Sequence, residues 1–457
     1  MIRRRSSGLA RRRRAGSRGR AGSSGRAGSR VRAGSRGPAG SGRRRAAPRR
    51  RLRVGVIFGG RSVEHAVSLV SARAIMEALD PARYEVVPIG VTRQGRWVTS
   101  GTRYAIPPDP SVGGLVVLKP DGTRAGGRRA AGARGALPAR RGGPGRLDVV
   151  FPMIHGTGGE DGSLQGLLEL AGLPYVGAGV LGSAIGMDKA VMKALFREAG
   201  LPIVDFRVVR RRDFVRDPEH AVRLAAEAFG YPCFVKPCNG GSSVGVSKAR
   251  NRAGLLAALR LAARYDRKLM IERAIEAREI ECSVLGNDDP EASVAGEIVP
   301  ANEFYDYRAK YIDPGSRLVI PAPISDAQQR AVRDLAVRAF RTLDLSGMAR
   351  VDFFLDRQTQ AVFLNEINTI PGFTPISMYP KLWEASGLPF GRLVNRLIDL
   401  AVERHREKSA LVTDYDPGAN GRRGGGSGSG APGRRGAGPG AAGSGRSRSR
   451  RTGSRAA

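Results

Sequence analysis

The segment ARVDFFLDRQTQAVFLNEIN, residues 349–368, indicates the architecture of the second half of this 457-residue chain. Two apolar runs flank the short polar stretch RQTQ (357–360), a pattern typical of a β-hairpin. Folding the chain about that stretch places Asp352 roughly opposite Glu366. Strand side chains alternate between the two faces, so Glu366 and Asn368 point the same way. The hairpin is therefore predicted to gather two carboxylates and one amide on one face.

Such a cluster of oxygen atoms needs a positive charge, because two close carboxylates cannot both stay ionised without a cation or a proton between them. Oxygen ligands without Cys or His suit a hard cation such as Mg²⁺ or Mn²⁺, completed by water and phosphate oxygens. The solvent-facing end of an ordinary hairpin is the alternative at this point. The same alternation predicts that the neighbouring Asn365 points to the opposite face.

The net charge of +36 comes from the two ends of the chain and one internal segment. The ends, residues 1–52 and 408–457, are rich in Arg, Gly and Ser and poor in large apolar residues. They cannot bury enough surface to offset the entropy of ordering, so both are predicted to be disordered tails. Segment 119–146 is also basic and is predicted to be an insertion. The rest carries almost no net charge and is long enough for two or three domains.

The alternation of apolar strands with amphipathic helices that starts at residue 53 predicts an N-terminal open parallel α/β domain, residues 53–177. Ser62 is expected to cap its first helix. The remaining sequence is α+β and largely antiparallel. It is divided into a central lobe (178–271) and a C-terminal lobe (272–407), so the chain combines α/β and α+β architecture.

The stretch CNGGSSVGVSK, residues 238–248, is typical of a loop that cradles phosphate, because glycines let backbone N–H groups approach an anion closely. It lacks the spacing of a Walker P-loop, and a strand rather than a helix follows it. Lys236 lies in the apolar strand before it, where a buried ammonium needs an anionic partner. Lys189, at the start of a helix, is a second candidate for phosphate. A ligand-free flexible hairpin and a solvated lysine are the alternatives.

Three cysteines, Cys233, Cys238 and Cys282, form no C-x-x-C pair, and their odd number argues against a disulfide scaffold. A reducing compartment, the cytoplasm, is therefore expected. The sequence contains no apolar run near the ~18 residues of a membrane span, so no membrane association is expected.

Several motifs occur together in a characteristic order: GGRSVEHAVSLVSA, HGTGGEDGSLQG, GMDK, FVKP, GSSVGVSKA, EFYDYRAKY, ARVDFFLD and NEINTIPGFTPISMYPKLW. This order resembles the ATP-grasp superfamily and, within it, the D-alanine–D-alanine ligase family. The resemblance covers about residues 53–405. It implies an N-terminal substrate-binding domain followed by a two-lobed ATP-grasp fold.

The resemblance implies where ATP and its metal ions bind. Lys189 and Lys236 would neutralise the phosphates, and the loop of Gly241, Ser242, Ser243 and Gly245 would close over them. The adenine would be bound by Glu272 and the backbone of Ala274 and Ile275, and the ribose by Glu279. Two Mg²⁺ or Mn²⁺ ions would be held by Asp352, Glu366 and Asn368.

The resemblance also implies how two D-alanines bind. Glu64 would receive the ammonium of the first, near His155, although position 66 is Ala where the family usually has Glu. The carboxylate of the second would be bound by Ser377, the N–H of Met378 and Lys310. Charge that develops during the reaction would be stabilised by Arg350 and the Gly372 N–H. A hydrogen-bonded triad that shuts a loop over the site would consist of Glu64, Ser242 and Tyr311.

The implied reaction is ATP-dependent ligation of two D-alanines through an acyl phosphate, in a protein expected to be a homodimer. A ligase that joins D-alanine to D-lactate or D-serine is the nearest alternative, and Lys310 and Tyr311 favour the D-alanine dipeptide. A nucleic-acid-binding protein is the alternative from another class. Clustered tail arginines would bind nucleic acid only nonspecifically, since no aromatic residue lies among them for base stacking.

Overall fold

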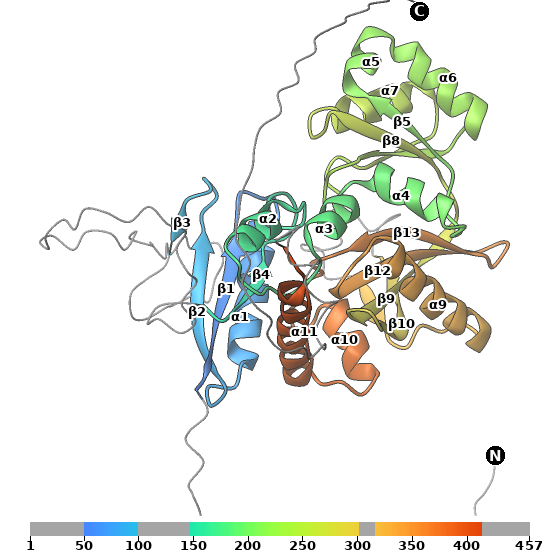
Figure 1. Cartoon of the computed structure of the whole chain (residues 1–457). Coiled ribbons are helices and arrows are strands. Elements are labelled where there is room, and N and C mark those ends of the chain that lie inside the picture. Colours follow the sequence, from blue (N-terminus) through green and yellow to red (C-terminus); the bar gives the residue numbers. More distant parts are fainter. Residues whose placement is uncertain (1–49, 99–146, 301–315, 414–457) are drawn as a thin grey trace, which may run out of the picture. The chain divides into compact units, whose positions relative to one another are not determined.

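A computed structural model describes residues 50–98, 147–300 and 316–413 of the chain (Figure 1). Both predicted tails lie almost entirely outside these residues, as does the basic insertion. Lys310 and Tyr311 also lie outside them, so their predicted roles stay predictions. Within the described ranges, no helix has the length and apolar character needed to cross a membrane.

The N-terminal sheet has the strand order β3-β2-β1-β4. Strand β1 pairs in parallel with both β2 and β4, which confirms the predicted open parallel sheet, and the short β3 pairs antiparallel at one edge. The elements of this region are β1 (Leu52–Gly59), α1 (His65–Ala78), β2 (Tyr84–Val91), β3 (Trp97–Val98), β4 (Val149–Met153) and α2 (Ser163–Leu170).

Helix α1 does not begin where the sequence indicated. Its N-cap is Glu64 rather than Ser62, and the Ser62 hydroxyl instead accepts a hydrogen bond from the Glu64 N–H at 3.1 Å. The Ser62 side chain thus stabilises the turn before the helix and does not cap it. Glu64 therefore lies in the connection between β1 and α1, beyond the carboxyl end of the strand, and it lines the cavity described below.

A second sheet, of strand order β5-β8-β6-β7, is antiparallel throughout. Helices α5, α6 and α7 pack on it through a core of small and aliphatic side chains (Figure 1). Its elements are β5 (Phe206–Arg210), α5 (Arg211–Arg216), α6 (Pro218–Ala228), β6 (Cys233–Pro237), β7 (Ser247–Ala249), α7 (Arg252–Ala262) and β8 (Lys268–Arg273). The predicted boundary at residue 271 falls inside β8.

The third sheet has the order β11-β10-β9-β12-β13. Helix α9 covers it with an apolar face whose buried side chains include Val332, Leu335, Ala336 and Ala339. The strands are β9 (Ala277–Gly286), β10 (Glu291–Val299), β11 (Arg317–Val319), β12 (Gly347–Asp356) and β13 (Val362–Asn368). The helices of this part are α3 (Val180–Met187), α4 (Lys189–Glu198), α9 (Asp326–Thr342) and α10 (Met378–Ala385).

The hairpin of β12 and β13 has the predicted register, with Asp352 paired to Glu366. The register shifts immediately afterwards, since Phe353 pairs with Leu364, and this leaves Asn365 as an extra residue. The extra residue breaks the alternation of faces. The prediction that Asn365 points away from the site is therefore wrong, because its Oδ1 accepts a hydrogen bond from Lys236 at 3.4 Å.

The last helix, α11 (Phe390–Ala410), completes the core of the first sheet. Its apolar face, with Leu393 and Leu397, joins one cluster with Val54 and Val56 of β1. These four side chains are fully buried. The N-terminal sheet thus depends on the C-terminal end of the fold for its hydrophobic core.

Candidate active site

A cavity of ≈ 830 Å³ collects most of the predicted site residues. Its size is in the range of small-molecule sites. Gly245 and Ala274 are absent from the described lining and lie in the adjoining loops. The predicted residues that line the cavity are Glu64, His155, Lys189, Lys236, Gly241, Ser242, Ser243, Glu272, Ile275, Glu279, Arg350, Asp352, Glu366, Asn368, Gly372, Ser377 and Met378.

Glu64 is 8% exposed and is held where two glycines make room for it. A Cβ at Gly156 or at Gly241 would lie 2.7 Å from Glu64 Oε2, so any larger residue at either position would displace the carboxylate. The Ser242 hydroxyl donates a hydrogen bond to Oε1. Oε2 has no hydrogen-bond partner among the described residues. A buried carboxylate oxygen of this kind is suited to receive an ammonium group from a ligand.

The Gly/Ser loop between β6 and β7 adopts an uncommon backbone conformation. Ser242 and Ser243 have φ angles of 50° and 57°, in the left-handed region that non-glycine residues seldom enter. Lys189 fixes the start of the loop by donating from Nζ to the Gly240 carbonyl at 2.9 Å. A constrained loop of this sort beside an ammonium group is typical of a phosphate site.

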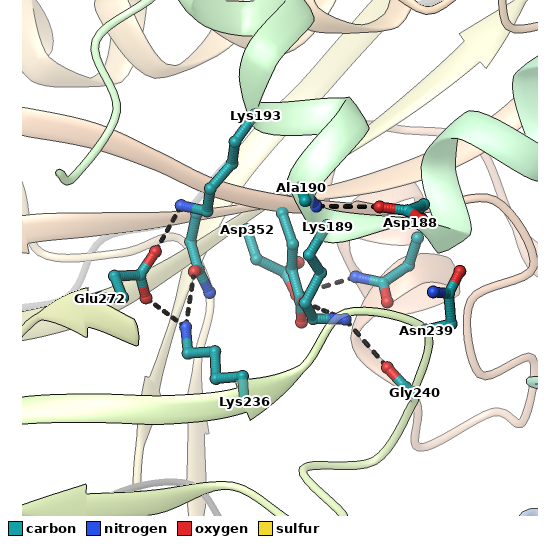
Figure 2. A network of polar contacts seen from close by, with 12 residues as sticks. Asp188, Lys189, Ala190, Lys193, Lys236, Asn239, Gly240, Glu272 and Asp352 are labelled. Carbon is teal, nitrogen blue, oxygen red and sulfur yellow. Dashed lines mark hydrogen bonds and ion pairs between the residues drawn. The ribbon is translucent and has the colours of Figure 1, made fainter. Parts of the chain in front are cut away.

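Two lysines and one glutamate form a buried charged group beside this loop (Figure 2). Lys193 Nζ lies 2.6 Å from Glu272 Oε1, and Lys236 is paired with Oε2 of the same carboxylate. Burial alone would raise the pKa of Glu272, but the two ammonium groups outweigh it and lower that pKa. The sequence analysis missed Lys193, although it follows Lys189 by four residues and so lies on the same face of the helix.

The residues predicted to bind the nucleoside lie along the end of β8, the loop that follows it and the start of β9. Ile275 lies in the loop and Glu279 lies in β9, where it pairs with Phe354 of β12. Both line the cavity. The Glu272 carboxylate is already bound to two lysines, so its predicted contact with adenine stays a prediction.

The oxygen cluster of the hairpin is neutralised by two cations. Asp352 accepts two hydrogen bonds from Arg350, both 2.7 Å, and one from the Asn368 amide at 2.9 Å. Glu366 Oε2 lies 3.0 Å from Lys189 Nζ. Burial opposes the charge on Lys189, but the Glu366 carboxylate outweighs it and raises the pKa of the lysine.

This cluster fits a hard divalent cation by its chemistry. Among the described residues, no group of three or more Asp, Glu, His or Cys side chains is arranged to hold a metal ion. The hairpin set has two carboxylates and one amide, all oxygen donors, with the paired register Asp352–Glu366. Mg²⁺ takes few ligands from protein and completes its shell with water and phosphate, so this small set is suitable.

Arg350 is held by two acids at once. Besides Asp352, its Nε lies 2.9 Å from Glu281 Oε2, and Glu281 is 4% exposed. Burial disfavours the cation, but Asp352 and Glu281 outweigh it and raise the pKa of Arg350. Sequence reasoning missed Glu281, although strand alternation places it on the same face of β9 as Glu279.

His155 is buried and connects the first sheet to the turn that contains Gly372. Its Nδ1 donates to the Ile370 carbonyl at 2.9 Å, so Nε2 accepts from the Ser71 hydroxyl at 3.2 Å. Ser71 Oγ in turn accepts from the Phe373 N–H at 3.3 Å. Burial lowers the pKa of His155, which keeps the ring neutral at pH 7. Both ring nitrogens therefore serve to fix the turn.

Glu160 supports the same turn and was also missed. Its Oε1 accepts from the Ile370 N–H at 2.8 Å and its Oε2 from the Gly156 N–H at 2.6 Å. Burial and the neighbouring Glu64 raise the pKa of Glu160 to about 8. Ile370, two residues before Gly372, thus has its N–H and its C=O both bound by side chains of the 155–160 loop.

Glu160→Gln is expected to make stability less sensitive to pH. The pKa of Glu160 is about 8 in the folded protein, above its ordinary value of 4.5. The protonated side chain therefore stabilises the folded state, and this contribution to the free energy of unfolding is fully present below pH 4.5. That stability is lost as pH rises through 8, at up to ~1.4 kcal/mol per pH unit. Urea unfolding at pH 5, 7 and 9 should show that the free energy of unfolding of the variant increases relative to that of the wild type as pH rises. A difference that stays constant with pH would contradict the raised pKa.

The N-terminus of α10 faces the cavity. Ser377 is the N-cap residue and Met378 the first helical residue, and both line the cavity. The Ser377 hydroxyl pairs with that of Thr374 at 2.8 Å. First-turn N–H groups of a helix favour an anion, so this end suits a substrate carboxylate.

Comparisons with known proteins agree with this site. Residues 53–178 match the family described as "D-ala D-ala ligase N-terminus" and residues 195–399 match "D-ala D-ala ligase C-terminus". The D-alanine–D-alanine ligase of Thermoanaerobacter sp. (strain X514) is 54% identical over 359 residues, covering 78% of this chain and 98% of the relative. That of Heliobacterium modesticaldum is 50% identical over 378 residues, covering 80% and 98%.

Solved structures give the same result. The D-alanine–D-alanine ligase of Coxiella burnetii is 38% identical with a TM-score of 0.62, covering 79% of this chain and 96% of that one. The D-Ala:D-Ser ligase VanG of Enterococcus faecalis is 32% identical with a TM-score of 0.62, covering 77% and 100%. The resemblance read from the motifs is confirmed, and the chain belongs to the D-alanine–D-alanine ligase family.

Proposed function

We propose that this chain joins two D-alanines to D-alanyl-D-alanine with ATP, for the synthesis of peptidoglycan precursors. The observation that carries the proposal is the Glu64–Ser242 hydrogen bond. It joins a phosphate-type loop to a buried carboxylate whose second oxygen has no hydrogen-bond partner among the described residues. One cavity thereby offers places for an amino acid and for nucleotide phosphates. The D-alanine–D-alanine ligases of Thermoanaerobacter and Heliobacterium are 54% and 50% identical to this chain, against 32% for the D-Ala:D-Ser ligase, and this difference favours the dipeptide.

In the first step, the carboxylate of one D-alanine attacks the γ-phosphorus of ATP, which forms an acyl phosphate and expels ADP. Glu64 orients the first D-alanine through its ammonium, while Lys189 and Lys236 offset the phosphate charge. A divalent ion held by Asp352, Glu366 and Asn368 would supply further neutralisation of the phosphates. Positioning and charge stabilisation account for most of the catalysis in such a site.

In the second step, the neutral amine of another D-alanine attacks the acyl carbonyl and phosphate leaves. The N-terminus of α10, with Ser377 and Met378, holds the carboxylate of this second D-alanine. Arg350 and the Gly372 N–H stabilise the negative charge that develops on the carbonyl oxygen. Glu160, His155 and Ser71 set the position of that N–H by fixing the turn.

The reaction itself is the test. The full-length chain should release phosphate from ATP only when D-alanine and Mg²⁺ or Mn²⁺ are both present, with D-alanyl-D-alanine as product by mass spectrometry. D-alanine with D-lactate or D-serine should give mainly the D-alanine dipeptide. Phosphate release that ignores D-alanine, or equal use of L-alanine, would show that the assignment is wrong.

Several expectations stay predictions. The homodimer is checked by light scattering and the cytoplasmic location by fractionation. Nonspecific nucleic-acid binding would reside in the tails, almost all of which lie outside the described residues, and would weaken steeply with salt.

A further inference from the structure

The buried charged group of Lys193, Glu272 and Lys236 contains one more cation than its single carboxylate needs. Lys193 and Glu272 are each 1% exposed, whereas Lys236 is 9% exposed and lines the cavity. Lys193 is absent from the described lining of that cavity. Of the two lysines, only Lys236 is thus placed to touch a ligand.

The three side chains come from separate elements. Lys193 lies on α4, Lys236 on β6 and Glu272 on β8, and β6 and β8 are neighbouring strands. In Figure 2 the two ammonium groups approach the Glu272 carboxylate from different sides, one at each oxygen. Either lysine can therefore move away from Glu272 while the other keeps its ion pair with that carboxylate.

A buried carboxylate without any cation is strongly unfavourable. If Glu272 had Lys236 as its only partner, a nucleotide phosphate would have to compete with Glu272 for that lysine. With Lys193 at the other oxygen, Glu272 keeps a counter-ion when Lys236 turns to the phosphate. Stability alone does not explain a lysine at position 193, because an apolar side chain would fill the same space without the cost of desolvating a charge.

We propose that Lys193 is a positioning residue that neutralises Glu272 and so releases Lys236 for the phosphates of the bound nucleotide. The inference rests on the proposed function, since it takes Lys236 to be a nucleotide ligand. It assigns to Lys193 an effect on ATP affinity rather than on D-alanine affinity or on the chemical steps.

The test is direct binding of ADP to the full-length chain by calorimetry, with kinetics in parallel. Lys193→Met should weaken ADP binding and raise KM for ATP by about tenfold, within the range of coupling between contacting charges. KM for D-alanine should stay within twofold, and kcat at saturating ATP within threefold. If the methionine variant does not accumulate as folded protein, Lys193→Gln, which keeps a hydrogen-bond donor without the charge, should weaken ADP binding in the same direction.

A double-mutant cycle identifies the route. In a Glu272→Gln background Lys236 is no longer tethered, so Lys193→Met should change ADP affinity by less than twofold relative to Glu272→Gln alone. The cycle also cancels any direct contact that Glu272 makes with adenine. An equal loss of ADP affinity in both backgrounds would overturn the inference, because Lys193 would then not act through Glu272.

Lys268→Met is the matched control, because it breaks another ion pair between the same two elements. Lys268 lies on β8 and pairs with Asp188, the N-cap of α4, and neither residue belongs to the described lining of the cavity. It should lower Tm and leave ADP affinity unchanged. If Lys193→Met behaved in the same way, Lys193 would be structural and the inference wrong. A wild type that binds no ADP would instead overturn the proposed function itself, and the inference with it.

Discussion

Glu366→Gln is expected to lower kcat about 100-fold or more and to raise the Mg²⁺ concentration needed for half-maximal rate, as a weakened charge clamp should. Glutamine keeps the shape of the side chain but removes one anionic ligand from the hairpin. Lys189, 3.0 Å from Glu366, loses its ion pair with that carboxylate, so stability should fall modestly, on the order of 1–2 kcal/mol. Phosphate release against Mg²⁺ concentration, with a thermal melt, measures both effects.

The control for this variant must lie on the same hairpin but outside the site. Asn365 does not qualify, because its amide contacts Lys236. Asp356→Asn does, since Oδ1 of Asp356 accepts the N–H groups of Gln358 and Thr359 at the hairpin turn, which an amide oxygen also accepts. Its Mg²⁺ dependence should match the wild type. Normal turnover and normal Mg²⁺ dependence in Glu366→Gln would refute the metal role of this strand.

Arg350→Met should reduce kcat by about 10²–10³-fold, the usual effect of losing a group that stabilises an oxyanion. It would also leave Asp352 and Glu281 facing each other without their shared cation, at a cost of about 3–5 kcal/mol in stability. Arg350→Lys separates the two effects, because lysine keeps the charge but cannot donate to both acids in a fixed fork. It should remain close to wild type in Tm and still lose most of kcat. Steady-state kinetics with thermal melts of both variants provide the measurement.

Arg333→Met serves as the comparison for Arg350. Its guanidinium, on α9, makes two hydrogen bonds to the Ala292 carbonyl at 3.0 and 3.2 Å, outside the described lining of the cavity. Stability should fall slightly and kcat should not change. An Arg350→Lys enzyme with wild-type kcat would show that the guanidinium plays no part in the chemistry.

The sequence allowed prediction wherever a local pattern sets the geometry. A short polar loop between two apolar strands fixes the hairpin register, and Asp352 does pair with Glu366. The start of α4 was predictable because Asp188 caps it, which places Lys189 beside the Gly/Ser loop. Motif order then identified the family, which no single pair of residues could do.

Other features depend on contacts that no local pattern encodes. The extra residue at Asn365 leaves the apolar pattern of β13 intact, so alternation put this side chain on the wrong face. Glu160 lies in a polar loop, and its partner Ile370 is 210 residues away in the sequence, so no local pattern connects the two. Lys193 is the intermediate case. Its helical spacing from Lys189 can be read from the sequence. Its anionic partner Glu272, however, lies on the separate strand β8, which no local pattern connects to α4.

The packing of α11 against β1 has a consequence for how the protein is made. Strand β4 leaves the ribosome about 250 residues before α11 is complete, a delay on the order of tens of seconds at usual rates of translation. Until then Val54 and its neighbours lack the helix that buries them in the finished fold. We expect the nascent N-terminal region to be a client of chaperones, and a chain truncated before Phe390 to aggregate although every catalytic residue assigned above has been synthesised.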